Sequence, residues 1–175
     1  MDELLAWLHA ASWSVHVGGA LTMEWVLRHA QRTMPPSQVA EVCKNAGMRY
    51  RWVALGALLA AGATGLLMLL SIDDAELAGR IGNPALDLGD EYGRTLLVLA
   101  VAWFALLFAV CAMAFWAHPA QRRRSHPSMS KDEIKLERQR VGQAIQTMDR
   151  ILKFELILGI VAIGLGASLN AGGFI

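Results

Sequence analysis

Two histidines lie near the N-terminus in an otherwise apolar stretch, LHAASWSVHVGG at positions 8–19. His9 and His16 are seven positions apart. That spacing is almost two turns of an α-helix, so both imidazoles would share one helix face, about 10 Å apart along the axis. Imidazole is an axial ligand of haem iron, and it also binds copper. The spacing is too long for both rings to bind one metal ion from the same side. Whether the histidines would bind haem or copper therefore depends on the elements that surround them.

The rest of the sequence is that of a membrane protein. Hydrophobic residues make up 55% of the 175 residues and charged residues only 18%, against roughly 25% in an ordinary soluble domain. Asp, Glu, Lys and Arg are absent from 4–23, 52–72 and 95–117, and again from Leu156 to the C-terminus. The first three windows are long enough to cross a hydrocarbon core of roughly 30 Å. Because lipid cannot satisfy exposed backbone groups, these windows should be helices.

We therefore expect an all-α fold, a four-helix up-down bundle that forms one membrane domain over residues 1–175. The expected spans are about 4–28, 50–72, 95–117 and 151–170. Pro35 and Pro36 break the loop between the first two spans. The pattern SKDE at 130–133 is a capping box, and the apolar stripe after it predicts a cytoplasmic helical extension at about 131–150. Small residues at helical spacing favour close packing, or a flat slot for a planar ligand. They are Ala57, Ala61, Gly65, Ala162 and Gly166.

Charge is uneven along the chain, although the formal net charge is only +1. Basic residues dominate 28–51 and 118–153, whereas 73–94 is mainly acidic. The positive-inside rule places both basic segments on the cytoplasmic side of a bacterial inner membrane and both termini outside. We therefore interpret the basic clusters as signals of membrane topology, and we expect no nucleic-acid partner. The acidic start MDE does not fit a cleaved signal sequence, so we expect the first span to be retained. Three tryptophans fall at the cytoplasmic boundary, as in an interfacial belt. They are Trp25, Trp52 and Trp116.

Other residues widen the choice of ligands. Met68, at the outer end of the second span, matches His9 in depth, and thioether with imidazole suits copper. His29 and His118 close the first and third spans at the same cytoplasmic level, so they form an alternative haem-ligand pair or contact haem propionates. Methionine is also an ordinary packing residue, and histidine is common at interfaces. Structural roles for all of these residues therefore stay open.

Two carboxylates lie just inside the expected cytoplasmic surface. Glu24 and Glu155 are near the level of several basic residues, so neutralised ion pairs are the simplest explanation. The basic residues are Arg28, Arg49, Arg150 and Lys153. The alternatives are a proton path through the carboxylates, or arginines such as Arg28 and Arg49 that hold haem propionates. No nucleophile elbow, phosphate-binding loop, HExxH or CxxC motif is present in the sequence.

The first span resembles the opening helix of the copper-resistance D (CopD) family and of the related HemJ-type protoporphyrinogen oxidases. Those families read Leu-His, six residues, Trp and a pair containing glycine. His9 falls on the family histidine and Gly18-Gly19 on the glycines, whereas His16 stands where tryptophan is expected. TG at 64–65, YGRTLLVLA at 92–100 and RILKFELILGIVAIG at 150–164 are similar to the later spans. Glu155 falls on the family glutamate, and Leu99 stands where a lysine is usual.

The resemblance implies a four-helix membrane protein that binds haem b or handles copper, with His9 as the inherited ligand. His16 and Leu99 depart from the oxidase pattern, and an added histidine favours a second ligand or a second haem. The leading hypothesis is a haem b protein that transfers electrons across or within the membrane, to or from a quinone or a redox partner subunit. The alternatives are a copper-translocating protein and a protoporphyrinogen oxidase. Assembly into a homo-oligomer stays open.

Overall fold

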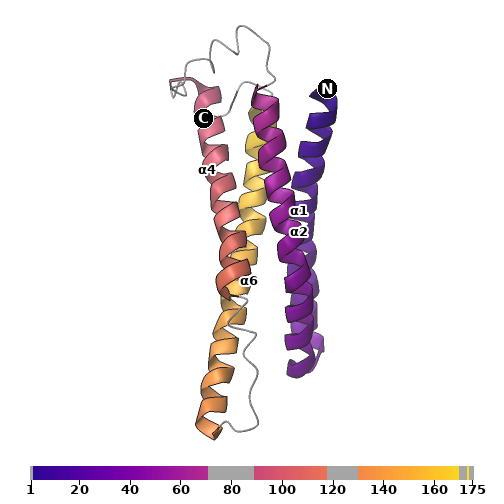
Figure 1. Ribbon diagram of the computed structural model, residues 1–175, viewed down its shortest axis with the longest axis vertical. Coiled ribbons are helices and arrows are strands. Elements are labelled where there is room, and N and C mark those ends of the chain that lie inside the picture. The colour runs from indigo at the N-terminus through magenta and orange to yellow at the C-terminus, as the bar shows by residue number, and fades with distance from the viewer. Residues whose placement is uncertain (1, 71–88, 118–129, 170–172, 174–175) are drawn as a thin grey trace.

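The computed structural model describes residues 2–70, 89–117, 130–169 and Gly173, and every regular element within these residues is helical. The elements are α1 (Asp2–Thr33), α2 (Pro36–Leu70), α4 (Glu91–Ala112), the π-helix η1 (Met113–Ala117) and α6 (Lys131–Leu169). The long helices lie side by side and alternate in direction (Figure 1). α1 begins and α6 ends at the same end of the bundle, which we call the terminal end.

The connection between α1 and α2 is much shorter than the sequence interpretation proposed. α1 continues to Thr33 and α2 begins at Pro36, well before the expected residue 50. Proline suits the first position of a helix, since the N–H that it lacks would have no partner within the helix. The proline pair therefore separates two helices, and the residues on either side of it, expected to form a loop, extend both helices instead.

Three of the described helices are long and apolar enough to cross a membrane. The spans are Asn45–Leu70, Glu91–Phe115 and Gln146–Leu169. α1 is not among them, because its histidines, serines and tryptophans lower the mean hydropathy of its charge-free part. The chain is thus an all-helical protein with three helices of membrane-spanning character in its described part.

The helices close a ring in which α1 contacts α2 and α6, and α4 contacts α2 and α6. Leu58, Leu106 and Val110 are fully buried at its centre. Alanines with little or no exposure surround them and let the backbones approach closely. These are Ala20, Ala54, Ala61, Ala102 and Ala162. The expected small-residue stripe on α2 is therefore used for packing at Ala57 and Ala61.

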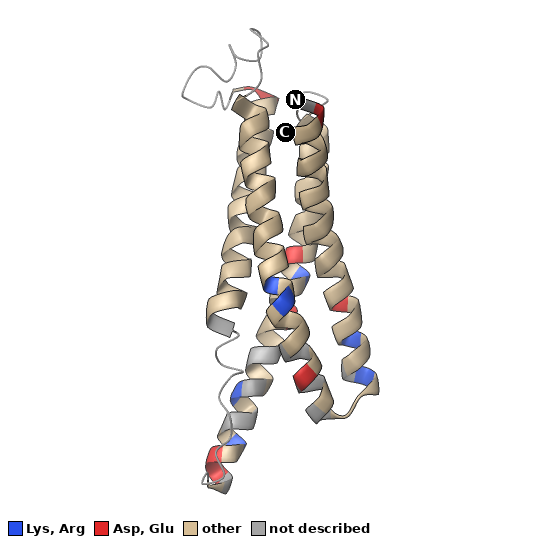
Figure 2. Cartoon of the chain, turned by 45° about the vertical axis from the view of Figure 1, so that its right-hand side comes forward, with Lys and Arg blue, Asp and Glu red and all other residues tan. Residues whose placement is uncertain are grey.

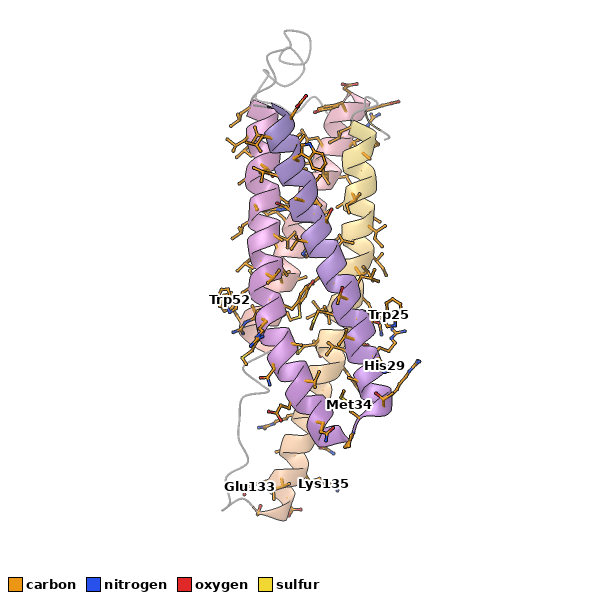
Figure 3. The ribbon with its side chains drawn as sticks, turned by 90° about the vertical axis from the view of Figure 1, so that its right-hand side faces the viewer. Trp25, His29, Met34, Trp52, Glu133 and Lys135 are labelled. Atoms are coloured by element: carbon orange, nitrogen blue, oxygen red, sulfur yellow. The ribbon has the colours of Figure 1, made fainter. Side chains whose placement is uncertain are left out.

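The bundle has two chemically different halves. No Asp, Glu, Lys or Arg occurs in α1 at 4–23, α2 at 52–70, α4 at 95–115 or α6 at 156–169, and we call this part the charge-free half. Figure 2 shows most of the Lys and Arg residues beyond it, towards the opposite end, which we call the basic end. Trp25 and Trp52 project outwards at the same level near that boundary (Figure 3). Exposed tryptophans at one level are typical of a membrane interface.

α4 changes geometry where it meets α2 near the basic end. Its last turn continues as the π-helix η1, and Arg51 Nη1 of α2 donates a hydrogen bond to the Ala114 carbonyl oxygen at 3.2 Å. The Arg51 guanidinium also lies over the Trp52 ring, 5.3 Å from its centroid. Arg51 thus ties α2 to a carbonyl in the wider turn of η1, where the usual helical hydrogen-bond pattern is altered.

The expected capping box opens α6. The Ser130 N–H donates to Glu133 Oε2 at 2.7 Å, and the Glu133 N–H donates to Ser130 Oγ at 3.3 Å. Donation from the Ser130 backbone, and then from its side chain, lowers the pKa of Glu133 below its ordinary value of 4.5. The pKa of Glu133 is therefore lower in the folded protein than in the unfolded chain. Its ionised carboxylate stabilises the start of α6 fully at pH values above the ordinary pKa, and this stabilisation is lost as the pH falls through the lowered pKa.

Glu133→Gln is therefore expected to speed amide hydrogen exchange in the first turn of α6 at neutral pH. The stability of this turn should also depend less on pH in the variant than in the intact chain. Glutamine is neutral, so the reciprocal bond loses its charge assistance. The measurement is residue-resolved hydrogen exchange. Asp132→Asn is the matched control, since Asp132 carries the same charge in the same turn but is not part of the capping box. Equal exchange in both variants would contradict a specific role for the reciprocal bonds.

Candidate functional site

Polar side chains line up in the interior between α1, α2 and α6, and we call this set the polar column. α1 contributes His9, Trp13 and His16, α2 contributes Tyr50 and Thr64, and α6 contributes Glu155. The three α1 residues are four and three positions apart, which places them on one face of the helix. Both sequence-predicted imidazoles therefore face the bundle, His16 fully buried and His9 partly buried.

His9 uses both ring nitrogens in hydrogen bonds. Trp13 Nε1 donates to His9 Nε2 at 3.2 Å, and an indole nitrogen can only donate. The network thus assigns the proton of a neutral ring to Nδ1. Nδ1 lies 3.0 Å from the Ala61 carbonyl oxygen and 3.1 Å from Thr64 Oγ1 on α2. To bind a metal through Nε2, His9 would have to give up its bond to Trp13.

A glycine on α2 makes room for the His9 ring. A Cβ atom at Gly65 would lie 3.0 Å from His9 Cε1, tighter than ordinary van der Waals contact. The glycine therefore lets the imidazole reach the Ala61 carbonyl oxygen on the α2 backbone. The small-residue stripe of α2 thus receives a histidine side chain at this level.

His16 is buried without a hydrogen bond. Neither Nδ1 nor Nε2 has a partner within the described residues, and the ring meets the Trp13 ring edge-on at 6.2 Å between centroids. Gly159 of α6 lies opposite, where a Cβ would be 3.9 Å from His16 Cδ2 and 2.8 Å from Val17 Cγ2. Because buried polar groups in proteins nearly always have partners, an imidazole without one points to a functional role.

Glu155 is the second buried ionisable group without full hydrogen bonding. Its side chain is fully buried, Oε2 accepts a hydrogen bond from the Tyr50 hydroxyl at 3.4 Å, and Oε1 has no partner within the described ranges. Glu155 precedes Gly159, which faces His16, by four residues on α6. The Glu155 backbone therefore lies about one helical turn, roughly 5.4 Å along α6, from the point of that helix opposite His16.

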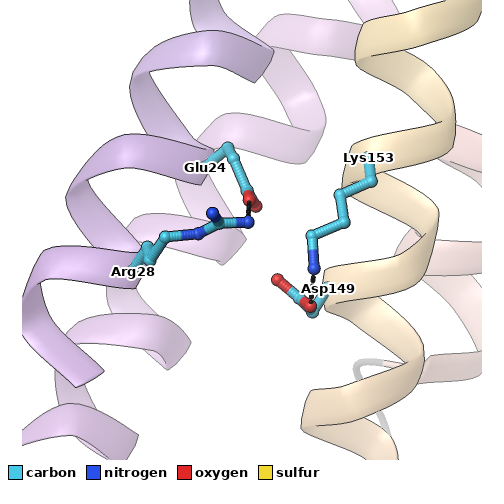
Figure 4. Close-up of polar contacts among 4 residues, drawn as sticks. All are labelled: Glu24, Arg28, Asp149 and Lys153. Carbon is cyan, nitrogen blue, oxygen red and sulfur yellow. Dashed lines mark hydrogen bonds and ion pairs between the residues drawn. The ribbon is translucent and has the colours of Figure 1, made fainter. Parts of the chain in front are cut away.

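The other expected carboxylate, Glu24, forms an ion pair with Arg28 on its own helix. Lys153 pairs with Asp149 at 2.5 Å on α6. Figure 4 shows the side chains of the two pairs projecting towards each other between α1 and α6. Both pairs are partly exposed, so each contributes only a few tenths of a kcal/mol, roughly 0.3–0.5. The ion-pair explanation thus describes Glu24, whereas Glu155 is bound to a tyrosine hydroxyl.

Of the remaining sequence candidates, His29 and Arg49 lie away from the polar column. His29 is exposed at the basic end (Figure 3), and His118 lies outside the described residues, so their pairing stays a prediction. Arg49 is exposed. Met68 is one turn beyond Gly65 on α2 and is therefore near His9 in level, as expected. Within the described part of the chain, no group of three or more His, Cys, Asp or Glu side chains is placed to hold a metal ion.

Haem b fits the polar column only in part. His16 offers two ring nitrogens that no described group occupies, which suits an axial ligand. The space beside it does not suit a macrocycle, because α1 and α6 meet closely at Val17 and Gly159. A planar group between them would require these helices to separate. Copper fits less well, since both His9 nitrogens are engaged and His16 is then the one histidine of the polar column with nitrogens left for a metal ion.

Sequence reasoning missed three members of the polar column. Trp13, Tyr50 and Thr64 each hydrogen-bond to a sequence-predicted site residue or lie between two of them. A signal for Trp13 is present, since it lies between the two histidines at helical spacing. Thr64 belongs to the TG motif at 64–65 quoted above, but its contact with His9 was not predicted, and for Tyr50 the sequence gives no signal, because the partners of both residues are on other helices.

Comparison of the chain with models of protein families, with curated proteins and with solved structures found no match. The resemblance to the CopD and HemJ families therefore rests on the short motifs quoted above. What the chain does has to be inferred from the polar column itself.

Proposed function

We propose that the chain is an integral membrane protein that binds and releases a proton within the membrane, at Glu155 and His16. One observation carries this proposal. Both side chains are fully buried in adjoining helices, and three of their polar atoms have no partner within the described residues. Ionisable groups inside a membrane protein are rare, face the interior and mark proton relays and ion pathways.

In this proposal α1 is a fourth membrane-spanning helix. Its charge-free part, 4–23, is about 30 Å long and packs against α2 and α6. Four crossings place both termini on one side, and the basic end is then cytoplasmic, in a bacterial inner membrane. A hydrocarbon core of roughly 30 Å that starts at Leu169 ends near Arg150, so Glu155 lies inside it.

In the proposed chemistry the site takes up one proton and releases it again, and while it is held the proton moves between two groups. The proton on the Glu155 carboxyl moves to a ring nitrogen of neutral His16, leaving a carboxylate and an imidazolium, and the reverse step restores the neutral pair. The site has no net charge before or after, so the transfer brings no unbalanced charge into the apolar interior. In this proposal water in the site carries the proton between the two groups. The Tyr50 hydroxyl donates to Oε2 of the carboxyl, and Oε1 has no partner within the described residues.

Infrared difference spectra of the purified chain between acidic and alkaline buffer test this function. A protonated carboxyl has a C=O stretching band that a carboxylate lacks, and a buried carboxyl absorbs at higher frequency than hydrated ones. We expect such a band, and we expect Glu155→Gln to remove it. A spectrum without a high-frequency carboxyl band would overturn the proposal.

A haem b electron carrier is the second candidate, favoured by the two unpartnered nitrogens of His16. In that case His16→Ala should abolish or strongly shift the Soret and reduced-state bands of the haem-supplemented protein. His9→Ala should leave them nearly unchanged, because both His9 nitrogens are engaged elsewhere. A quinone or a redox partner subunit would exchange the electrons. An intact chain without a Soret band rules this candidate out, and copper without haem in metal analysis would favour the copper-translocating alternative.

A further inference from the structure

We propose that Trp13 closes the proton site towards the terminal end, so that Glu155 and His16 exchange protons only with the basic end. This inference rests on the proposed proton function. Protons would then enter and leave the site from one end of the bundle only. The resting protein would bind protons without conducting them across the membrane.

Trp13 lies between the two imidazoles of α1. Its ring meets His9 edge-on at 6.4 Å between centroids and 74°, and meets His16 edge-on at 6.2 Å and 77°. The side chain is only 8% exposed and belongs to the hydrophobic core. An aromatic ring therefore fills the place where a hydrogen-bonded link between His9 and His16 would have to pass.

The chemistry of indole makes this ring a barrier. A proton relay needs groups that both donate and accept, as imidazole, carboxyl and hydroxyl groups do, whereas indole has one N–H donor and no acceptor. That single donor is committed to His9 Nε2. The hydrogen-bonded chain that starts at Thr64 and passes through His9 therefore stops at Trp13, one helical turn short of His16.

Towards the basic end the polar groups continue. The Tyr50 hydroxyl both donates and accepts, and it contacts Glu155 directly. Beyond it, the Glu24–Arg28 and Asp149–Lys153 pairs project into the region between α1 and α6 (Figure 4). Glu24 is only 12% exposed, whereas the side chains of Arg28 and Lys153 are 50% and 44% exposed. Polar and charged groups therefore continue on this side of the site and become more exposed with distance from it, whereas on the other side Trp13 follows His16 directly.

The test uses the full chain in lipid vesicles, with an internal pH dye and a potassium gradient plus valinomycin to drive protons. We expect the intact chain to differ little from protein-free vesicles, and Trp13→His to increase proton flux several-fold, because imidazole can relay a proton from His9 to His16. Trp13→Ser is a second variant, since its hydroxyl relays and its small size admits water. Trp13→Phe, which keeps an apolar ring, should stay closed. Trp7→His is the matched control, because Trp7 is exposed on the same helix.

The flux should fall back in the double variant Trp13→His with Glu155→Gln, if the opened path runs through the site. Flux that persists there overturns the inference, as does unchanged flux in both Trp13→His and Trp13→Ser, or an intact chain that conducts as well as they do. These results are separable from failure of the proposed function. A high-frequency Glu155 carboxyl band with no flux through the opened variants removes only the role of Trp13, whereas absence of the band removes the proton function itself.

Discussion

Replacing Glu155 with glutamine is expected to abolish the high-frequency carboxyl signal in acid-minus-alkaline infrared spectra while leaving the bundle folded. Glutamine has nearly the same size and its amide oxygen still accepts a hydrogen bond from Tyr50, but it has no ionisable proton. Glu155 is fully buried, so its C=O band lies apart from those of hydrated carboxyls. Unchanged helical content by circular dichroism would show that the loss of signal is local.

Two further variants make this result specific. Tyr50→Phe removes the hydroxyl that donates to Glu155 Oε2, so the carboxyl band should shift in frequency and persist. Glu24→Gln is the matched control, because Glu24 belongs to an ion pair at the basic end and should leave the band unaltered. A band that survives Glu155→Gln, or that disappears in Glu24→Gln, would assign the proton to another carboxyl.

The helices themselves could be predicted from the sequence because their causes are local. Lipid demands internally satisfied backbone, so a window without charges is a helix, and SKDE at 130–133 starts a helix by reciprocal hydrogen bonds between near neighbours. The shared face of His9 and His16 follows from helical periodicity alone. Membrane crossing by α1 stays a prediction, because its polar side chains lower the mean hydropathy of the segment and α1 is not among the three helices of membrane-spanning character.

The site could be predicted only in part, because its contacts join distant segments. Tyr50 and Glu155 are 105 positions apart in the chain, and no periodicity specifies the register of α2 against α6. The same limit applies to His9, whose role as a ligand depends on whether Thr64 and Trp13 occupy its nitrogens. The sequence indicated which helix face is chemically important, but the register between helices decides that His16, and not His9, has unpartnered nitrogens.

α2 also packs closely against α4. Gly62 lies against the indole ring of Trp103, whose Nε1 donates to the Leu58 carbonyl oxygen at 2.9 Å. The ring also meets Phe104 edge-on at 4.8 Å between centroids. Trp103 is thus bound to the α2 backbone one turn before the glycine, and it has little freedom to move away from residue 62.

Gly62→Ala is therefore expected to destabilise the bundle strongly. The added Cβ would lie 2.4 Å from Trp103 Cζ2, so the ring must move and weaken its bond to Leu58. Overpacking costs typically about 1–3 kcal/mol, and a lost hydrogen bond about 1 kcal/mol more. Denaturant or thermal unfolding in detergent measures the loss. Gly56→Ala is the matched control on the same helix, because nothing lies within 4 Å of its added Cβ and alanine favours a helix by up to about 1 kcal/mol over glycine. Equal stability of the two variants would show that α2 and α4 can separate at this contact, and the register that positions Tyr50 and Thr64 would then have to be held elsewhere.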